Sequence, residues 1–310
     1  MICVFIDGKE GTTGLRIWER LQGRNDIELI TLPEEKRKDP AARKEAIHSA
    51  DTVFLCLPDS AAMEAVELAK GSRARIIDAS TAHRTNPLWD YGFAEISHKQ
   101  RENIANSARV ANPGCHASGF ISLVRPLVDN GILAKDVLLT CHSVTGYSGG
   151  GKKMIAQYEN AGVDLLLSSP RQYGIGQSHK HLPEMAALSG IENAPVFSPI
   201  VSNIYSGMQV TVPLFASQLC KGKTIENIKK AYKELYCGPV VKYVEGGDEG
   251  GFLSATKLAG KDSMEISVYG NDERIILVSR YDNLGKGASG AAVQCFNIMH
   301  GLDETLSLEL

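Results

Sequence analysis

Short apolar runs alternate with segments of helical periodicity through the first part of the chain. The runs have the length of buried strands and cover residues 2–6, about 27–32, 53–57 and 74–78. Apolar residues at helical spacing lie between these runs, at residues 15–21, 41–50 and 61–70. We therefore expect a βαβαβαβ order, which is typical of a parallel sheet covered by helices on both faces.

Beyond about residue 115 the pattern changes to mixed elements with longer loops. A helical pattern begins at Cys115 and contains Pro126, which favours a kink or an early break. The other expected elements are a strand at 137–144, an amphipathic helix at 224–236, a hairpin that pairs 264–269 with 274–280, and a buried helix at 288–299. This mixture predicts an α+β domain with antiparallel pairing.

The length of the chain also favours two domains. With 310 residues, of which 43% are hydrophobic and 22% charged, it is too long for one comfortable core and too apolar to be disordered. The expected fold class is α/β, with a Rossmann-type, doubly wound parallel sheet formed by residues 1–114 plus 285–310. Residues 115–284 would form the second, α+β domain.

Composition narrows the classes of partner. The formal net charge is -3 and the pI is near 6.3, so we expect no binding to nucleic acid or to an anionic membrane. No apolar stretch approaches the ~20 residues that span a bilayer, and the first residues lack a leader pattern, so we expect a cytoplasmic protein with a small-molecule partner. The seven cysteines form no CxxC pair, which argues against a disulfide framework and a structural metal site.

A glycine-rich turn separates the first expected strand from the first expected helix. Its spacing, Gly8-x-x-Gly11-x-x-Gly14, differs from the common dinucleotide fingerprint but occupies the same place. Backbone N–H groups there could approach a pyrophosphate at the positive end of the helix, and Thr12 and Thr13 could add hydroxyl donors. The alternative, a tight turn that merely needs glycine, is weaker because the following strands complete the expected unit.

Other cofactor contacts are expected at the ends of later strands. Ligands of such sheets bind outside the carboxyl ends of the strands, where we find Pro58, Ser60 and Ser80. Residues 283–290 are rich in glycine and polar groups at the start of the last helix. Asn283 and Gly287 in this segment could therefore contact the cofactor.

Residues alone favour NADP over NAD only modestly. Glu34 and Glu35 lie about 20 residues past the glycine turn, where an acidic residue would bind the ribose of NAD. Lys36, Arg37 and the following lysine could instead neutralise the 2′-phosphate of NADP, although a short run of charges is commonly a solvated loop.

Cys115 is the residue that most needs a chemical explanation. It follows an Asn112-Pro113-Gly114 turn and would lie at the N-terminus of a helix, where unpaired N–H groups and the helix dipole stabilise a thiolate. A buried structural cysteine is the common alternative, but this turn is poor core material. The sequence therefore predicts a reactive nucleophile that needs no metal.

Two further polar segments could serve that nucleophile. His179, His181 and Glu184 lie in one segment, where an imidazole could act as general acid and base and the carboxylate could orient it. A metal site there is less favoured because no second ligand cluster completes it. Residues 143–152 have the composition of an anion-binding loop, or of a flexible surface loop, and supply the substrate candidates Ser143, Gly146, Ser148 and Gly149.

These residues together resemble the N-acetyl-γ-glutamyl-phosphate reductase family, and in particular its shorter form. The resemblance runs nearly end to end and rests on DGKEGTTG at residues 7–14, DASTAHR at 78–84, NPGC at 112–115, HKHLPE at 179–184 and GKGASG at 285–290. Five ordered blocks are highly specific together. His116 and Ala117 stand where longer members often carry Tyr-Pro.

The resemblance implies reduction of N-acetyl-glutamyl 5-phosphate to its semialdehyde in arginine biosynthesis, with NADPH, by a homo-oligomer. It implies that Cys115 is the nucleophile that forms a thioester, and that His179 or His181 is the acid–base residue. Arg84 and Asn112 are expected to contact the substrate, together with residues 143–151. The rival hypotheses are a semialdehyde dehydrogenase for another acyl phosphate and a non-catalytic NADP-binding regulator.

Overall fold

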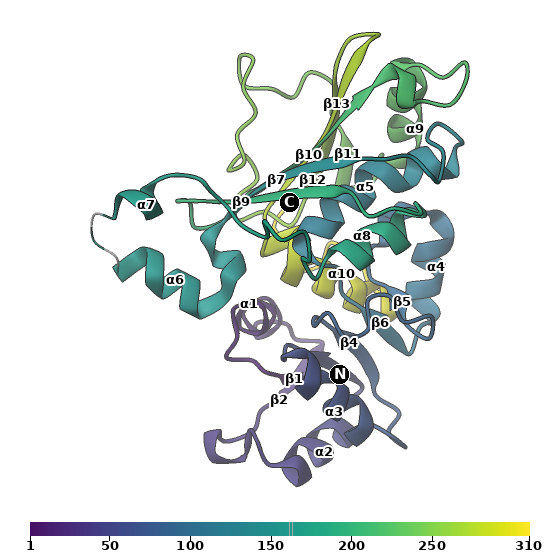
Figure 1. The fold of residues 1–310 in the computed structure, drawn as a ribbon. Helices are drawn as coiled ribbons and strands as arrows, with labels where there is room; N and C mark the ends of the chain where they lie inside the picture. Colours follow the sequence, from purple (N-terminus) through teal and green to yellow (C-terminus); the bar gives the residue numbers. More distant parts are fainter. Residues whose placement is uncertain (161, 163) are drawn as a thin grey trace. The chain divides into compact units, whose positions relative to one another are not determined.

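A computed structural model describes residues 1–160, 162 and 164–310, and these divide into two compact units. The first unit comprises Met1–Ala94, His98–Pro113 and Ala288–Leu308, and the second comprises Glu95–Ser97, Gly114–Gly287 and Glu309–Leu310. Each unit has its own sheet (Figure 1).

The first unit is a parallel sheet with helices on both faces, as the alternating pattern predicted. Its helices and strands are β1 (Ile2–Asp7), α1 (Thr12–Leu21), β2 (Ile27–Ile30), α2 (Pro40–Ser49), β3 (Thr52–Leu55), α3 (Asp59–Leu68), β4 (Arg75–Asp78), β5 (Asp90–Tyr91), α4 (His98–Asn106), β6 (Arg109–Ala111) and α10 (Gly290–Met299). The strand order is β2-β1-β3-β4-β6-β5, so the order reverses direction between β1 and β3. Ligands of open α/β sheets bind at such a switch point.

Two hydrophobic clusters fix the faces of this sheet. Alternate strand residues such as Val4 and Phe54 pack with α1, α4 and α10, whereas Phe5 and Val53 pack with α2 and α3. Because successive side chains of a strand point to opposite faces, continuous apolar strands require cover on both sides. The doubly wound fold class is thereby confirmed.

The second unit is a mixed sheet with helices packed on one face. Its helices and strands are α5 (Cys115–Asp129), β7 (Thr140–Gly146), α6 (Gly151–Asn160), α7 (Leu165–Ser168), β8 (Arg171–Gln172), α8 (Leu182–Ser189), β9 (Val196–Ser202), β10 (Met208–Phe215), α9 (Ile225–Leu235), β11 (Val241–Tyr243), β12 (Met264–Gly270) and β13 (Arg274–Tyr281). The strand order is β11-β12-β13-β10-β7-β9-β8, and the predicted hairpin is the antiparallel pair β12–β13. Helix α5 packs on β10 and β13, and α8 and α9 flank it.

Two details of this unit differ from what the sequence suggested. Helix α5 does not break early, because it continues through Pro126 to Asp129. Residues 143–146 are not loop, because β7 begins at Thr140 and runs to Gly146, followed by a 3-10 turn at Tyr147–Gly150 and then α6. Ser143 is buried within that strand. The glycine-rich residues that follow the strand lead into α6.

Candidate active site

The glycine turn of the first unit is shaped by close backbone contacts. Gly8 has a φ of +87°, and a Cβ there would lie 2.3 Å from the carbonyl oxygen of Cys56, which follows β3. A Cβ on Gly14 would lie 2.5 Å from the carbonyl oxygen of Gly8. Gly11 differs, because a Cβ there would meet only the carbonyls of Gly8 and Cys56, at 3.4 and 3.7 Å. Gly8 and Gly14 are therefore needed to close the turn, and Gly11 leaves its outer side open.

This turn delivers the chain into the N-terminus of α1. The helix begins at Thr12 with Gly11 as its N-cap, no side chain caps it, and its first turn holds no acidic residue. Its first N–H groups and positive dipole are thus available to an anion. Thr12 and Thr13 are half-buried beside these groups.

The other expected strand-end residues of the first unit form a linked pair of turns. Pro58 is the N-cap of α3, which places the exposed Ser60 in its first turn. After β4, the backbone N–H and hydroxyl of Ser80 donate to the Asp78 carboxylate at 2.9 and 2.7 Å. The backbone N–H of Thr81 donates to Asp59 at 2.8 Å, which ties the two turns together.

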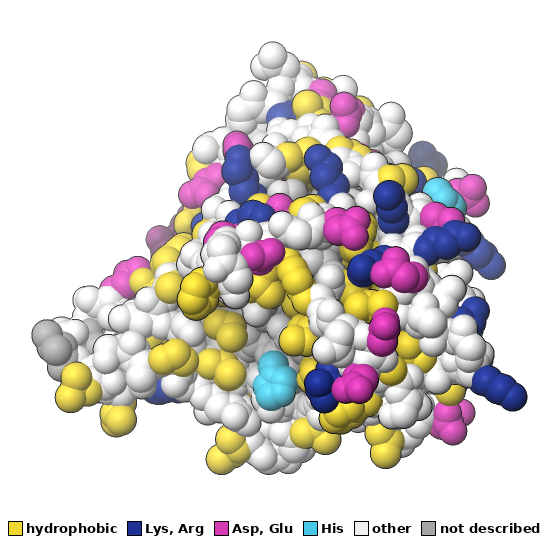
Figure 2. All heavy atoms as spheres, turned by 90° about the horizontal axis from the view of Figure 1, so that it is seen from above, with side chains coloured by type: hydrophobic (Ala, Val, Ile, Leu, Met, Phe, Trp, Pro, Cys, Tyr) yellow, Lys and Arg dark blue, Asp and Glu magenta, His cyan; other side chains and the backbone are white. Residues whose placement is uncertain are grey.

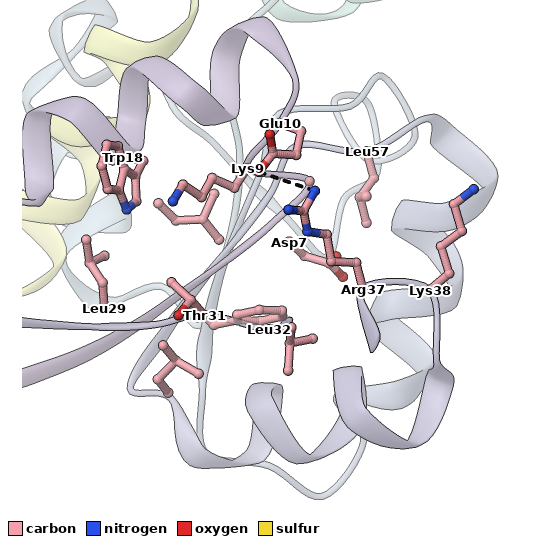
Figure 3. A pocket seen from close by; sticks show the side chains of 14 residues that line it. Asp7, Lys9, Glu10, Trp18, Leu29, Thr31, Leu32, Arg37, Lys38 and Leu57 are labelled. Carbon is pink, nitrogen blue, oxygen red and sulfur yellow. Dashed lines mark ion pairs between the residues drawn. The ribbon is translucent and has the colours of Figure 1, made fainter. Parts of the chain in front are cut away.

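A cavity of about 340 Å³ opens beside the glycine turn. Its lining comes from β1, the glycine turn, α1, the end of β2 and the segment that follows, and includes Asp7, Gly8, Lys9, Glu10, Trp18, Leu29, Thr31, Leu32, Arg37, Lys38 and Leu57 (Figure 3). The ammonium group of Lys9 lies over the Trp18 ring, 3.8 Å from its centroid. Arg37 forms an ion pair with Glu10 at 3.4 Å, and both side chains remain largely exposed.

Only some of the charged residues that follow β2 line this cavity. β2 ends at Ile30, so its carboxyl end presents the neutral Thr31 to the cavity. Glu34, Glu35 and Lys36 form a short 3-10 helix and are not part of the lining, whereas Arg37 and Lys38 are. The cavity therefore carries cations and no acidic residue from this segment.

Arg84 and Asn112 are both buried in the first unit. The Arg84 guanidinium donates to the backbone carbonyls of Asn112 at 3.0 Å and Ala79 at 3.1 Å. The Asn112 amide nitrogen donates to the carbonyl of Ala288 at 3.0 Å, while its oxygen is buried without a hydrogen-bond partner in the described residues. Next to them, His83 contacts the Asp78 carboxylate at 2.6 Å and stacks on Trp89.

Cys115 is the first residue of α5, as predicted from the glycine turn before it. It forms no disulfide, and its side chain is half-buried. The carboxylate of the buried Glu184, from α8, accepts a hydrogen bond of 2.8 Å from the backbone N–H of Gly114. The hydroxyl of Tyr281 donates to the Cys115 carbonyl at 2.5 Å and accepts from the backbone N–H of Gly119 at 3.0 Å. The start of α5 is thus held from two sides.

Gly287 packs directly against the nucleophile candidate. A Cβ at Gly287 would lie 3.1 Å from the Cβ of Cys115 and 3.0 Å from the carbonyl oxygen of Asp282. Any larger residue would therefore crowd Cys115. Asn283, four residues earlier, forms two hydrogen bonds within its unit. Its amide nitrogen donates to Ser148 Oγ at 3.0 Å and its oxygen accepts from the backbone N–H of Gly207 at 3.0 Å.

Two histidines and a tyrosine lie around His116, the residue that follows Cys115. The ring of His116 lies 5.6 Å from the rings of both His179 and His181, and 6.1 Å from that of Tyr173, measured between centroids. The backbone N–H of His181 donates to Nδ1 of His179 at 3.2 Å. Since that nitrogen accepts, the neutral form of His179 carries its proton on Nε2.

Burial favours the neutral forms of His116 and His179 by lowering the pKa of each ring. Desolvation, with a further contribution from His179, lowers the pKa of His116 to about 3. Desolvation and the neighbouring Lys180 also lower the pKa of His179. Desolvation and, secondarily, the negative charge of Cys115 raise the pKa of Tyr173.

Sequence reasoning missed several residues of this region. It did not single out Tyr173, Tyr281 or Gln177, whose side-chain amide forms two hydrogen bonds with the backbone of Phe197 (2.8 and 2.9 Å) and thereby fixes the histidine segment on β9. The signal for Tyr173 was its place in the same polar segment as His179. Tyr281 gave no local signal, because its contacts lie about 160 residues away along the chain.

Neither a metal site nor a membrane span was found in the described ranges. No group of three or more His, Cys, Asp or Glu residues in them could hold a metal ion. No helix there is long and apolar enough to cross a bilayer.

Comparisons with protein families match both parts of the chain. The model of the semialdehyde dehydrogenase NAD-binding domain matches residues 4–106. The model of the semialdehyde dehydrogenase dimerisation domain matches residues 115–283.

Solved structures similar to this one carry the same fold at low sequence identity. Aspartate semialdehyde dehydrogenase II from Vibrio cholerae superposes with a TM-score of 0.73 at 16% identity, covering 97% of this chain and 99% of that one. Aspartate semialdehyde dehydrogenase from Candida albicans, solved with NADP, has a TM-score of 0.66 at 13% identity over 97% and 98% of the two chains.

Several curated relatives are much more similar in sequence. The protein named N-acetyl-gamma-glutamyl-phosphate reductase from Sinorhizobium medicae (strain WSM419) is 47% identical over 303 residues, which cover 96% of this chain and 98% of the relative. Its namesake from Brucella ovis is 45% identical over 305 residues, with the same coverage. The chain therefore belongs to the semialdehyde dehydrogenase family and, within it, to the N-acetyl-gamma-glutamyl-phosphate reductases.

Proposed function

We propose that the chain catalyses the NADPH-dependent reduction of N-acetyl-L-glutamyl 5-phosphate to N-acetyl-L-glutamate 5-semialdehyde, with release of phosphate, as a step of arginine biosynthesis in the cytoplasm. The observation that carries the proposal is the half-buried side chain of Cys115 at the N-terminus of α5, which forms no disulfide. The names of relatives that align over nearly the whole chain support this substrate over other acyl phosphates.

The first chemical step is acyl transfer to Cys115. The thiolate attacks the carbonyl carbon of the acyl phosphate, a C–S bond forms, and the C–O bond to phosphate breaks. The N-terminus of α5 favours the thiolate, and its N–H groups can stabilise the oxyanion of the tetrahedral intermediate, at on the order of 3 kcal/mol per donor. His179 or His181 supplies the proton that the leaving phosphate takes up.

The second step reduces the thioester. When bound, NADPH would supply a hydride to the thioester carbon, and Cys115 would then hold the thiohemiacetal oxyanion. Collapse of that oxyanion releases the aldehyde and returns the thiolate. Division of one difficult reduction into two steps is the advantage of covalent capture.

The cavity beside the glycine turn fits the cofactor. The open side of Gly11 and the N-terminus of α1 suit the pyrophosphate. Thr31 occupies the strand end where an NAD-binding domain places a carboxylate, so no negative charge there repels a 2′-phosphate. Arg37 and Lys38 then neutralise that phosphate, which makes NADPH the preferred donor.

We keep all of the expected substrate contacts as proposals except Ser143. Ser143 is buried in β7 with its hydroxyl on His116, so its role is within the protein. Gly146, Ser148 and Gly149 are the candidates for binding an anionic group of the substrate, and Arg84 and Asn112 are the candidates from the first unit.

The uncovered face of the second sheet fits a homo-oligomer. The face that points away from α5 carries partly or largely exposed residues on β7, β9, β10 and β13, namely His142, Val144, Val196, Ile200, Pro213 and Ile276. On β13 the same face also holds the exposed Arg274 and the buried Val278 and Arg280. Figure 2 shows hydrophobic side chains at the surface between charged ones. We propose that a second copy covers this face, in line with the dimerisation-domain match.

The decisive experiment runs the reaction backwards with purified protein. Incubation with the semialdehyde, phosphate and NADP should produce NADPH in the wild type and none in Cys115→Ser. Cys220→Ser, which removes another half-buried thiol of the same unit, should retain the activity. Equal turnover of aspartate semialdehyde would favour another acyl phosphate. Alkylation of Cys115 no faster than that of a free thiol would favour the non-catalytic regulator.

The same assay decides between the two histidines. His179→Asn and His181→Asn should differ by roughly 10²-fold or more in turnover, because general acid–base catalysis contributes about that much. Equal activity of both variants and the wild type would contradict an acid–base role for this segment.

A further inference from the structure

His116 has both ring nitrogens engaged although its side chain is buried. Nδ1 lies 2.7 Å from Oγ of Ser143 in β7, and Nε2 lies 2.6 Å from the hydroxyl oxygen of Tyr173, which follows β8. The ring is only 3% exposed. A neutral imidazole has one donor nitrogen and one acceptor nitrogen, so the two hydrogen bonds must run in the same direction along the chain Ser143–His116–Tyr173.

Only two arrangements of protons satisfy this chain. In one, Tyr173 donates to Nε2 and Nδ1 donates to Ser143. In the other, Ser143 donates to Nδ1 and Nε2 donates to Tyr173, so that the Tyr173 proton is free to point to another acceptor. The tautomer of His116 therefore decides where the phenolic proton points.

The backbone fixes Tyr173 in this position. Its N–H donates to the carbonyl of Pro199 in β9 at 3.0 Å, and the next residue, Gly174, packs on the ring of Pro199. His116 immediately follows Cys115 in the first turn of α5, so the phenol is brought next to the start of that helix. The negative charge of Cys115 contributes to the raised pKa of Tyr173, which agrees with this proximity.

We propose that Tyr173 donates a hydrogen bond to the negative charge at Cys115, and that His116 and Ser143 are positioning residues that direct its proton there. The acceptor is the thiolate in the free enzyme and the thiohemiacetal oxyanion after hydride transfer. No proton is lost or gained along the chain, because Tyr173 and His116 each donate one hydrogen bond and accept one. The role at the oxyanion rests on the proposed function, whereas the role at the thiolate does not.

Other titratable groups surround the same sulfur region and could affect its charge. These are His179, His181, Glu184 and Tyr281, in addition to His116 and Tyr173. Lys180 adds a positive charge next to His179. The test must therefore change the phenolic hydroxyl alone.

Alkylation of the enzyme without substrate is the first test. The rate of Cys115 modification by iodoacetamide, followed on the Cys115 peptide across pH, reports the thiolate fraction. Tyr173→Phe should move the midpoint upward by about one pH unit and slow modification at neutral pH about tenfold, since one pKa unit is a factor of ten. Tyr236→Phe, which removes another buried phenolic hydroxyl of the same unit, should leave the profile unchanged.

A double-mutant cycle in the reductase assay is the second test. Tyr173→Phe should lower kcat by roughly 10²-fold, as expected for the loss of one oxyanion donor. If His116 acts only through Tyr173, the His116→Phe, Tyr173→Phe double variant should be no slower than Tyr173→Phe alone. Additive losses, or a Tyr173→Phe variant with wild-type alkylation and turnover, would overturn the proposal.

A measurement on the wild type covers the case in which these variants do not fold. Nitrogen-15 NMR of His116 at neutral pH should show the neutral tautomer with its proton on Nε2. A charged ring, or a proton on Nδ1, would contradict the arrangement. A shifted alkylation profile in Tyr173→Phe, combined with no reductase activity in the wild type, would refute the proposed function but retain this inference.

Discussion

The hydroxyl of Tyr236 donates to the backbone carbonyl of Ser122 at 2.7 Å. Ser122 is four residues before Pro126, and a proline has no N–H with which to bond that carbonyl in the helix. Tyr236, which follows α9, supplies the missing donor from 114 residues further along the chain. The pair explains why α5 continues past its proline.

Removal of that hydroxyl should weaken the fold and spare the chemistry. Tyr236→Phe leaves the buried carbonyl of Ser122 without its donor, so the free energy of unfolding should fall by about 1–3 kcal/mol. Urea unfolding measures this change. Tyr243→Phe is the control, because the buried Tyr243 hydroxyl has no hydrogen-bond partner in the described residues and its loss should cost little. Equal destabilisation by both variants would contradict the capping role.

The glycines of the first turn should respond differently to alanine. Gly8→Ala places a Cβ against the carbonyl of Cys56 at a positive φ, so it should destabilise the first unit by several kcal/mol or prevent folding. Gly11→Ala should be tolerated by the fold, since its nearest contact is 3.4 Å away, but it should weaken NADPH binding because the Cβ enters the space proposed for the pyrophosphate. Thermal unfolding with and without NADPH separates the two effects. Unchanged NADPH affinity in Gly11→Ala would place the pyrophosphate elsewhere.

The cofactor preference should depend on Thr31 and Arg37. Thr31→Asp with Arg37→Ala restores a carboxylate at the end of β2 and removes a cation, so KM for NADPH should rise by roughly 10- to 100-fold, the effect of about 1.4–2.8 kcal/mol. KM for NADH should fall. Lys36→Ala is the matched control, because Lys36 is not part of the cavity lining. A Lys36→Ala variant that loses NADPH affinity as strongly as the double variant would contradict this assignment.

Stability should fall as pH is lowered from neutrality. The pKa of His116 is lowered from 6.5 to about 3, so between these values the unfolded chain binds a proton that the folded chain does not. The folded state is then disfavoured by about 1.4 kcal/mol per pH unit below pH 6.5 for this group. His116→Gln, which cannot titrate, should show a shallower decline when urea unfolding is followed from pH 7 to pH 5. The same slope in variant and wild type would mean that His116 is not buried as a neutral ring.

The local features of the site could be predicted from sequence, whereas its long-range partners could not. Cys115 was placed at a helix N-terminus because the glycine turn and the apolar spacing behind it are local signals. The partners of His116 lie 27 and 57 residues away, on separate elements, and no local pattern encodes such contacts.

Sequence spacing also gave a wrong position for the end of a strand, because β2 is shorter than its apolar pattern. Glu34 and Glu35 lie at the spacing expected of a ribose ligand, but β2 ends at Ile30 and the chain turns into a 3-10 helix. The strand end therefore presents Thr31 instead. Conversely, β7 is longer at its end than its pattern indicated. It extends to Gly146, so the first residues of a segment with loop-like composition belong to a buried strand.

Trapping of the acyl-enzyme tests the central claim most directly. The enzyme is mixed with N-acetyl-L-glutamyl 5-phosphate in the absence of NADPH, and both released phosphate and intact protein mass are measured within one turnover. The account predicts one phosphate per active site and a protein heavier by one N-acetylglutamyl group on Cys115, which hydroxylamine removes. Unmodified Cys115 with turnover intact once NADPH is added would contradict it.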